Sequence, residues 1–212
     1  MLERSLKHSE ALDTESLCIV GGEKVWQINC DINIIDGSGG NIIDVCMLSV
    51  ISALKAFRKP DISVIPCIYE EDDIMQPVKG FGLAPISGTG RPNVNILVHH
   101  SNNREPLPLA LHHTPITVTL GVVKARTELK TLLLTDPSRE EEAALDGKIT
   151  FSVNAHNELC ALSKPAGRGL TAVHIVHAAK IASVRAALLH TKLNTAIDQL
   201  EERVKSQRQK EL

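Results

Sequence analysis

An alternating run from Trp26 to Ile34 is the feature that most constrains the fold of this 212-residue chain. Trp26, Ile28, Cys30, Ile32 and Ile34 alternate with Gln, Asn or Asp residues. Side chains of a β-strand point alternately to two faces, so this pattern predicts a strand with one buried face. Gly21 and Gly22, just before the run, predict a hairpin turn.

Three stretches predict helices. Residues 42–57 are apolar on almost every side, which is typical of a helix sandwiched in the core, and Asn41 is placed to cap it. Residues 2–12 predict a shorter helix that ends near Asp13. Residues 171–206 contain no Gly or Pro and predict a long closing helix with a charged end. The residues expected on its apolar side are Val173, Val176, Val184, Ala187 and Leu188, followed by Leu193, Ile197, Leu200 and Val204.

Several short strands and one surface loop complete the pattern. The strands are predicted at residues 62–68, 94–98, 115–123, 131–135, 148–153 and 158–163. Pro66 predicts an edge position for the first strand, and Asp136-Pro137 predicts a helix start. Residues 69–93 are acidic and then rich in Gly and Pro, as in a surface loop. The order of elements predicts an α/β (α+β layered) fold with mostly antiparallel pairing.

Composition excludes several classes of protein. The 23 basic and 25 acidic residues give a net charge of -2, which argues against nucleic-acid binding by bulk attraction alone. No run approaches the ~18 uncharged apolar residues of a membrane helix, and the first residues lack a signal core. The five cysteines form no CxxC pair and lie mostly in apolar runs, so we expect buried free thiols in a reducing compartment.

Two segments suggest binding chemistry, each with a structural alternative. The turn Asp36-Gly-Ser-Gly-Gly40 before the core helix resembles a phosphate cradle, but it lacks the Lys and Ser/Thr of a P-loop and is equally a glycine turn. The acidic group Asp136, Glu140, Glu141, Glu142 and Asp146 would suit magnesium, yet carboxylates also favour the first turn of a helix. The histidine pairs at 99–100, 112–113 and 174/177 lack an evident carboxylate or Cys companion.

Several segments in order resemble the ribonuclease PH family. They are LERSLKHSEALDTESLCIVGGEKVWQINCDINIID, GNIIDVCMLSVISALKAFRKPD, EPLPLALHHTPITVTLGVV and LLLTDPSREEEAALDGKITFSVNAHNELCALSKP, and together they span most of residues 2–165. The similarity is greatest to the non-catalytic ring subunits of the eukaryotic RNA exosome, especially the polymyositis–scleroderma autoantigen type. The resemblance implies an RNase PH-like fold (ribosomal protein S5 domain 2-like).

The resemblance also implies what the site residues do. Active members carry Gly-Gly-Thr-Arg, whose Arg holds phosphate, where this chain has Gly40-Asn41-Ile42-Ile43, so Ile43 takes the Arg position. A branched apolar side chain cannot make charged, bidentate hydrogen bonds to phosphate. Glu140 and Asp146 match two catalytic, metal-binding aspartates. We therefore expect a degenerate site with no catalytic residues, no cofactor and no bound metal.

The expected partners follow from the same resemblance. They are other RNase PH-like exosome subunits in a hetero-oligomeric ring, cap subunits, and RNA. Arg4 and Lys7 would contact the RNA through its sugar-phosphate backbone. No membrane is expected. The implied localisation is nucleus, nucleolus and cytoplasm. The alternatives are an active phosphate-dependent 3′–5′ exoribonuclease using Glu140 and Asp146, or a small metal- or nucleotide-binding domain using the glycine turn.

The resemblance suggests three parts of the chain. Residues 1–106 match the N-terminal part of the RNase PH-like domain, without the opening strands that family members have and with an insertion at 69–93. Residues 107–186 match the C-terminal subdomain, and residues 187–212 form a charged helical extension. Because Met1 sits almost directly on the opening helix, the chain is expected to be an N-terminally truncated form.

Overall fold

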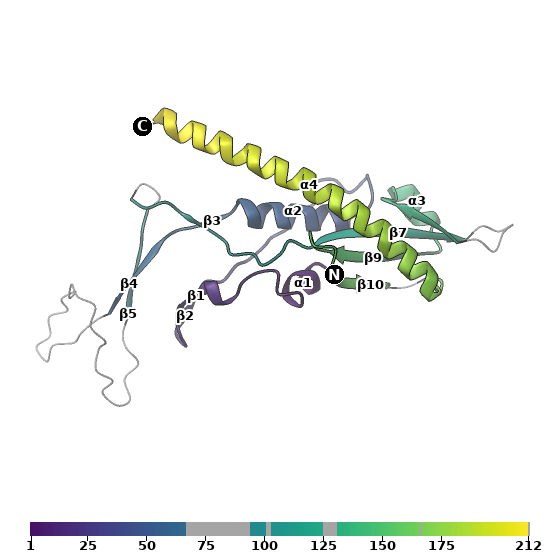
Figure 1. Ribbon diagram of the computed structural model, residues 1–212, viewed down its shortest axis with the longest axis horizontal. Helices are drawn as coiled ribbons and strands as arrows, with labels where there is room; N and C mark the ends of the chain where they lie inside the picture. The colour runs from purple at the N-terminus through teal and green to yellow at the C-terminus, as the bar shows by residue number, and fades with distance from the viewer. Residues whose placement is uncertain (67–93, 101–102, 125–130, 166, 212) are drawn as a thin grey trace, which may run out of the picture. The chain divides into compact units, whose positions relative to one another are not determined.

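The computed structural model describes residues 1–66, 94–100, 103–124, 131–165 and 167–211 (Figure 1). The chain forms two compact units. The first consists of Met1–Leu17, Gln27–Phe57 and Leu109–Leu212, and the second of Cys18–Trp26 and Arg58–Pro108. The predicted boundaries at 106/107 and 186/187 stay predictions.

A four-stranded antiparallel sheet is the centre of the first unit. Its strands are β7 (Ile116–Lys124), β8 (Thr131–Thr135), β9 (Gly147–Val153) and β10 (Leu159–Ser163), in the order β10-β9-β7-β8. All four strands were predicted within two residues of these bounds. The α+β layered architecture with antiparallel pairing is confirmed.

The long helix α4 (Ala172–Glu211) packs on one face of this sheet. Val118, Leu120 and Val122, at every second position of β7, all point to that face. They form one buried cluster with the fully buried Ala178, Ala182 and Ala186 of the helix. Alanines four residues apart lie on one side of a helix and let its backbone approach the sheet closely. Large branched side chains on the strands thus fill the core against small side chains on the helix.

The predicted apolar side of α4 is wrong for its first half. The residues assigned to it are exposed, namely Val173, Val176, Val184, Ala187 and Leu188. The helix carries two apolar stripes, and the alanine stripe fits the bulky β-branched surface of the sheet. Further along, Leu193 is buried as predicted and Ile197 is half-buried, whereas Leu200 and Val204 are exposed.

Helix α2 (Ile42–Ala56) is buried on one side only. Met47 and Ile51 join Ile116 and Leu193 in a second core cluster. Val45 is 63% exposed, so the prediction that this helix is covered all round is wrong. Apolar residues on every side of a helix permit full burial, but other elements must be present to cover each side.

The alternating run at residues 26–34 predicts a strand, but the structure has no strand there. Strands β1 (Cys18–Val20) and β2 (Lys24–Val25) make the predicted hairpin at Gly21-Gly22, and β2 ends where the run begins. Among the described residues none pairs with residues 26–35, and Ile35 is 100% exposed. A strand exists only when its backbone groups meet a partner, so the pattern alone did not suffice.

The helix at the start of the chain is shorter than predicted. Helix α1 covers Leu2–Lys7, because the backbone of Glu10 turns left-handed (φ 54°) and Leu12 forms an isolated bridge with Leu111. A short 3-10 helix follows at Glu15–Leu17. Helix α3 (Arg139–Ala144) begins after Asp136-Pro137, close to the predicted start.

The described part of the second unit contains three short two-stranded ribbons, of which β1–β2 is one. In the others, β3 (Arg58–Lys59) pairs with β6 (Leu107–Pro108), and β4 (Ile62–Pro66) with β5 (Val94–Val98). Arg104 Nη1 donates to Asp61 Oδ2 at 2.9 Å, which holds the pKa of that carboxyl below its usual range. The predicted 69–93 loop lies outside the described residues.

Cysteine burial differs from the prediction. Cys46 is buried in α2 and Cys160 is half-buried, but Cys18 and Cys30 are exposed, while Cys67 lies outside the described residues. Burial raises the pKa of the Cys160 thiol, so this thiol stays protonated at neutral pH.

Among the described helices, α4 alone has the length and apolar content that a membrane span requires. Part of that apolar content is the alanine stripe, which is already packed on the sheet.

Candidate active-site region

The glycine turn and the start of α3 lie in direct contact. Gly40 has a φ of +82°, and a Cβ at this position would lie within 2.6 Å of the Ser138 carbonyl carbon and 2.9 Å of the Pro137 carbonyl oxygen. Only glycine allows both this backbone conformation and this close approach. Residues 36–44 and 136–140, which sequence analysis singled out separately, therefore form one region.

Asp36 holds the turn itself. Its Oδ1 accepts from the Ser38 backbone N–H at 2.8 Å and its Oδ2 from the Ser38 hydroxyl at 2.9 Å. These two bonds, the backbone one first, hold the pKa of Asp36 below its usual range. Side chains of Asp that bond the backbone two residues on are typical of tight turns, which supports the structural interpretation of the segment.

Asn41 joins the two segments through its side-chain amide. The residue occupies the N-cap position of α2, as predicted, but its side chain makes no capping hydrogen bond. Its Nδ2 donates instead to Asp44 Oδ2 at 2.9 Å and to Asp136 Oδ1 at 2.8 Å. The side chain is buried, and its Oδ1 has no partner among the described residues. Its φ of 47° is in the left-handed region, which Asn tolerates better than most residues.

Asp44 connects this region to the sheet. Its Oδ2 accepts from the Thr119 backbone N–H at 2.6 Å, and its Oδ1 from the Thr119 hydroxyl at 2.9 Å. Thr150 of β9 extends the network, with 3.0 Å between the two threonine hydroxyls. Sequence reasoning missed this carboxylate. Its only local signal is an acid in the first turn of a helix, where the helix dipole favours one.

The acidic group proposed for magnesium is divided among separate contacts. Glu141 and Ser138 form a capping box at the start of α3. Glu142 lies 3.9 Å from the Lys148 ammonium, and Asp146 Oδ2 accepts from the Lys124 backbone N–H at 2.8 Å. Glu140 is exposed. Within the described ranges, no three His, Cys, Asp or Glu side chains are grouped as metal ligands. Glu141 thus caps the start of α3, and Glu142 and Asp146 contact residues of the adjoining strands.

The position matched to the phosphate-binding arginine lies in the first turn of α2. Ile43 is half-buried there, next to the exposed Ile42. No Lys or Arg occurs in the sequence between Lys24 and Lys55, so neither the glycine turn nor this helix turn contributes a cation. The turn has the glycines of a phosphate cradle without the positive charge.

Helix α1 presents the two residues predicted to contact RNA. Arg4 and Lys7 are both exposed, and the Lys7 ammonium lies 2.7 Å from the Glu3 carboxylate, whose pKa it lowers. The helix borders an open groove of about 1290 Å³. The charged residues lining this groove are Glu3, Lys7, Glu10, Asp13, Glu15 and Asp31. A mostly acidic lining does not favour phosphate groups inside the groove.

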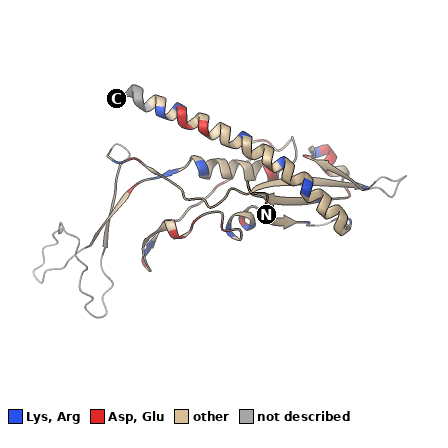
Figure 2. Cartoon of the chain, viewed as in Figure 1, with Lys and Arg blue, Asp and Glu red and all other residues tan. Residues whose placement is uncertain are grey.

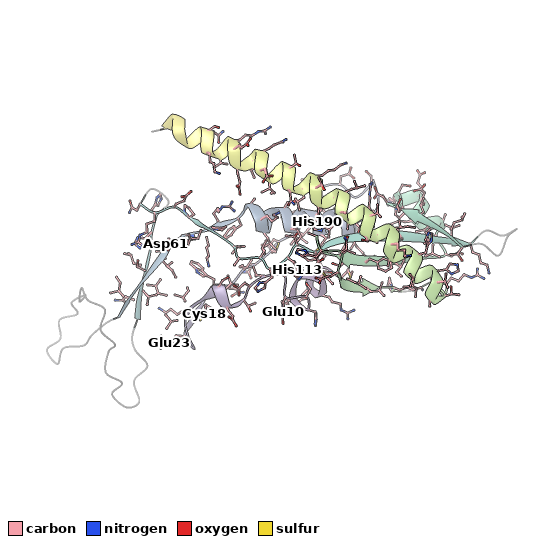
Figure 3. The ribbon with its side chains drawn as sticks, viewed as in Figure 1. Glu10, Cys18, Glu23, Asp61, His113 and His190 are labelled. Carbon is pink, nitrogen blue, oxygen red and sulfur yellow. The ribbon has the colours of Figure 1, made fainter. Side chains whose placement is uncertain are left out.

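Two histidines are packed inside the first unit rather than placed for metal binding, and Figure 3 labels both. His113 Nε2 bonds the Ser9 carbonyl at 2.6 Å. His190 of α4 is buried, with Nδ1 3.5 Å from the Thr114 hydroxyl and Nε2 3.5 Å from the Val153 carbonyl. Burial lowers the pKa of His190, so the neutral ring is favoured. The prediction singled out other histidines and missed this one.

Two domain models of a single family match the chain. The description "3' exoribonuclease family, domain 1" covers residues 1–60, and "3' exoribonuclease family, domain 2" covers residues 113–185. The first match contains the glycine turn and α2, and the second contains β7–β10 and α3. The Gly40–Ser138 contact therefore joins the two matched domains.

Curated relatives are similar over nearly the whole chain. Exosome complex component RRP45A of Arabidopsis thaliana is 32% identical over 93% of this chain and 55% of its own length. RRP45B of the same plant and RRP45 of Homo sapiens are each 34% identical over 88% of this chain, and over 36% and 35% of their own lengths. The chain thus spans between about a third and about half of these relatives.

Two solved structures share the fold. An Archaeoglobus fulgidus exosome with RNA bound to the active site matches 90% of this chain and 58% of its own, with a TM-score of 0.61 at 23% identity. An archaeal exosome core matches 91% and 60%, with a TM-score of 0.61 at 25% identity. The RNase PH-like fold inferred from the sequence is confirmed. From the two matched domains and the shared fold, we conclude that the chain belongs to the 3′ exoribonuclease (ribonuclease PH-like) family.

Proposed function

We propose that the chain is a non-catalytic subunit in the ring of an RNA exosome, supporting 3′–5′ RNA processing and degradation by assembly and by guiding RNA. Ile43 carries the proposal, because it occupies the position of the phosphate-binding arginine in a turn that contributes no other cation. Phosphorolysis requires the attacking phosphate to be held and its charge to be stabilised. A ring position is supported by relatives that are named exosome complex components.

Asn41 supports the loss of catalysis independently. At this position active members have the second glycine of their motif, whereas here a buried amide lies between Asp44 and Asp136. A side chain thus occupies space that a glycine would leave open. One carboxylate oxygen of Asp146, the residue matched to a catalytic aspartate, accepts a hydrogen bond from the Lys124 backbone N–H. The carboxylates of Asp44, Asp136 and Asp146 thus accept hydrogen bonds from donors within the chain.

The proposed partners are RNase PH-like subunits beside this one in the ring, cap subunits and RNA. Solved structures with the same fold are exosome cores, which supports the first of these. Arg4 is the better candidate for an RNA contact, since Lys7 is already paired with Glu3. The proposed localisation is nucleus, nucleolus and cytoplasm, to be checked by imaging of the tagged chain.

Assembly is tested by co-expressing the chain with a catalytic RNase PH-like subunit of the same organism. Size exclusion with mass determination should give a stable one-to-one complex. A folded monomer that ignores every RNase PH-like subunit offered would contradict the ring assignment.

Catalysis is tested separately on the purified chain, without the catalytic subunit. The chain should release no nucleoside diphosphates from RNA in phosphate, with an archaeal exosome core as positive control. Phosphate-dependent release that Glu140→Ala abolishes would restore the active-exoribonuclease alternative. Within the complex, Arg4→Glu should weaken RNA retention more than Lys7→Glu does, because Lys7 is already neutralised by Glu3.

A further inference from the structure

The N-terminal half of α4 presents an apolar stripe that nothing in the described chain covers. Its members are Val173 (76% exposed), Val176 (57%), Val184 (66%) and Leu188 (54%). They lie opposite the alanine stripe that packs on the sheet. They form two exposed apolar pairs with Lys180 between them, and exposed apolar patches rimmed by polar residues mark interaction surfaces.

The charges on this half of the helix are all of one sign. Between Ala172 and Ile197 the sequence contains Lys180, Arg185 and Lys192, and the first acidic residue is Asp198. Figure 2 shows the cations spaced along α4, with acidic residues only nearer its C-terminal end. All three cations are exposed, and no ion pair is formed by them in the described part of the chain.

Apolar and cationic side chains meet in one shallow groove. It has a volume of about 500 Å³ and lies between the end of β8, at Thr135, and α4. The helix contributes His177, Lys180, Ile181, Val184, Arg185 and Leu188. Val184 and Leu188 are one turn apart, with Lys180 one turn before Val184, so the apolar contact is framed by positive charge.

We propose that this face of α4 binds an acidic amphipathic helix of a protein partner. Apolar residues of that helix would pack on Val184 and Leu188, and its carboxylates would meet Lys180 and Arg185. Paired apolar and charged contacts of this kind are typical of a helix bound in a groove. The proposal goes beyond a place in the exosome ring, and the two are measured by different experiments.

The two other anionic surfaces fit this face less well. RNA phosphates would meet the cations, but a phosphate backbone has no apolar groups to pack on the exposed valines. For base stacking, α4 contains no Phe, Tyr or Trp, and the ring it places in the groove is the imidazole of His177. A lipid surface usually takes a helix with Trp or Phe on its apolar side, which α4 also lacks. A peptide helix uses both the apolar and the charged parts of the surface.

The test measures binding of the full chain to a labelled synthetic helix by fluorescence anisotropy. The probe is a three-turn-or-longer amphipathic peptide with leucines on one face and glutamates on the other, and its partner probe has lysines in place of the glutamates. The glutamate peptide should bind, and the lysine peptide should bind at least about tenfold more weakly. Lys180→Glu with Arg185→Glu should reverse this preference.

Two kinds of variant separate the groove from general charge. Val184→Ser with Leu188→Ser removes the apolar contact without changing charge and should abolish binding of the glutamate peptide, with far-UV circular dichroism confirming that the helix persists. Lys205→Glu, on the exposed part of the same helix, is the matched control and should leave binding unchanged. Equal losses in Lys205→Glu, or failure of the charge reversal, would overturn the proposal.

Two further probes test the rival surfaces. A 12-nucleotide oligouridine and vesicles of phosphatidylcholine with phosphatidylglycerol should bind more weakly than the glutamate peptide and should be insensitive to the neutral change Val184→Ser. Stronger binding of either, lost in that variant, would assign the face to RNA or to lipid and overturn the proposal. Ring assembly is scored separately by size exclusion, so loss of one activity does not imply loss of the other.

Discussion

Strand β9 and the segment from Trp26 to Ile34 have the same alternating pattern, but only β9 is a strand. In β9, Ile149 and Phe151 point to one face and are at most 1% exposed, while the strand pairs on both sides with β7 and β10. In the other segment Ile32 is 41% exposed and Ile34 57%. Alternation indicates which side chains share one face of a strand. Pairing with neighbouring strands decides whether that face becomes buried.

The difference is energetic as well as geometric. Each residue ordered in a strand loses about 1–2 kcal/mol of backbone entropy, which ladder hydrogen bonds and burial must offset. The described residues contain no ladder hydrogen bonds to the segment at 26–35, and of its apolar residues only Trp26 and Ile28 are half-buried. Its exposed isoleucines therefore contribute little to the stability of this chain.

The largest predicted effect breaks the paired region. Phe151→Ala removes a fully buried ring from the core under α4 and should lower the free energy of unfolding by about 3–5 kcal/mol. Ile34→Ala, the matched change in the unpaired segment, should lower it by less than about 0.5 kcal/mol. Urea unfolding followed by circular dichroism measures both, and similar losses at the two positions would contradict the comparison.

A second prediction concerns the contact between the glycine turn and α3. Gly40→Ala places a methyl group against the Ser138 backbone at a positive φ, so we expect a loss of about 2–4 kcal/mol. Gly39 is the control, since a Cβ there would meet no atom within 4 Å. Thermal unfolding should separate Gly40→Ala from Gly39→Ala, and matching midpoints would show that the contact can relax.

The third prediction tests the carboxylate that sequence reasoning missed. Asp44→Ala leaves the Thr119 N–H without its acceptor and removes one of the two acceptors of the Asn41 amide, which should cost about 1.5–3 kcal/mol. Asp198→Ala, at an exposed position of α4, is expected to change stability by less than about 0.5 kcal/mol. The network is unimportant if denaturant midpoints of the two variants coincide.

The smallest effect depends on pH. The folded chain holds the pKa of His190 below its ordinary value, so below about pH 6.5 the unfolded chain takes up a proton that the folded chain resists. Stability should therefore fall as the pH drops below that value, until the folded pKa is reached. His190→Gln should flatten this dependence, whereas His156→Gln, at an exposed position, should preserve it. Parallel pH profiles for both variants would exclude His190 as the cause.

The sequence predicted elements well where local pattern and final environment agree. Strands β7–β10 and helix α4 fall close to their predicted ranges, because each pairs or packs with elements of the same unit, and α3 begins close to its predicted start. It failed on the choice between two apolar stripes of α4, since Val184 outranks Ala182 in hydrophobicity but not in fit to the sheet. Which stripe is buried depends on the opposing surface, which the sequence of a helix does not contain.

The same limit applies to the candidate site. Resemblance identified Ile43, Glu140 and Asp146 by position. The structure adds the hydrogen bond from the Lys124 backbone N–H to Asp146. The bridge from Asn41 to Asp44 and Asp136 joins residues up to 95 positions apart. No local pattern predicts such a contact. Asn at a left-handed position signals a turn, and Asp in a first helical turn signals only a favourable dipole.

Gly40 has a consequence for how relatives of this chain are compared. The residue is required by the touching backbones of two segments, so natural selection for folding retains it whether or not the chain performs chemistry. An intact glycine turn in a newly found relative is therefore no sign of activity. The informative position is three residues later, at Ile43, where the family resemblance implies that phosphate binding requires an arginine.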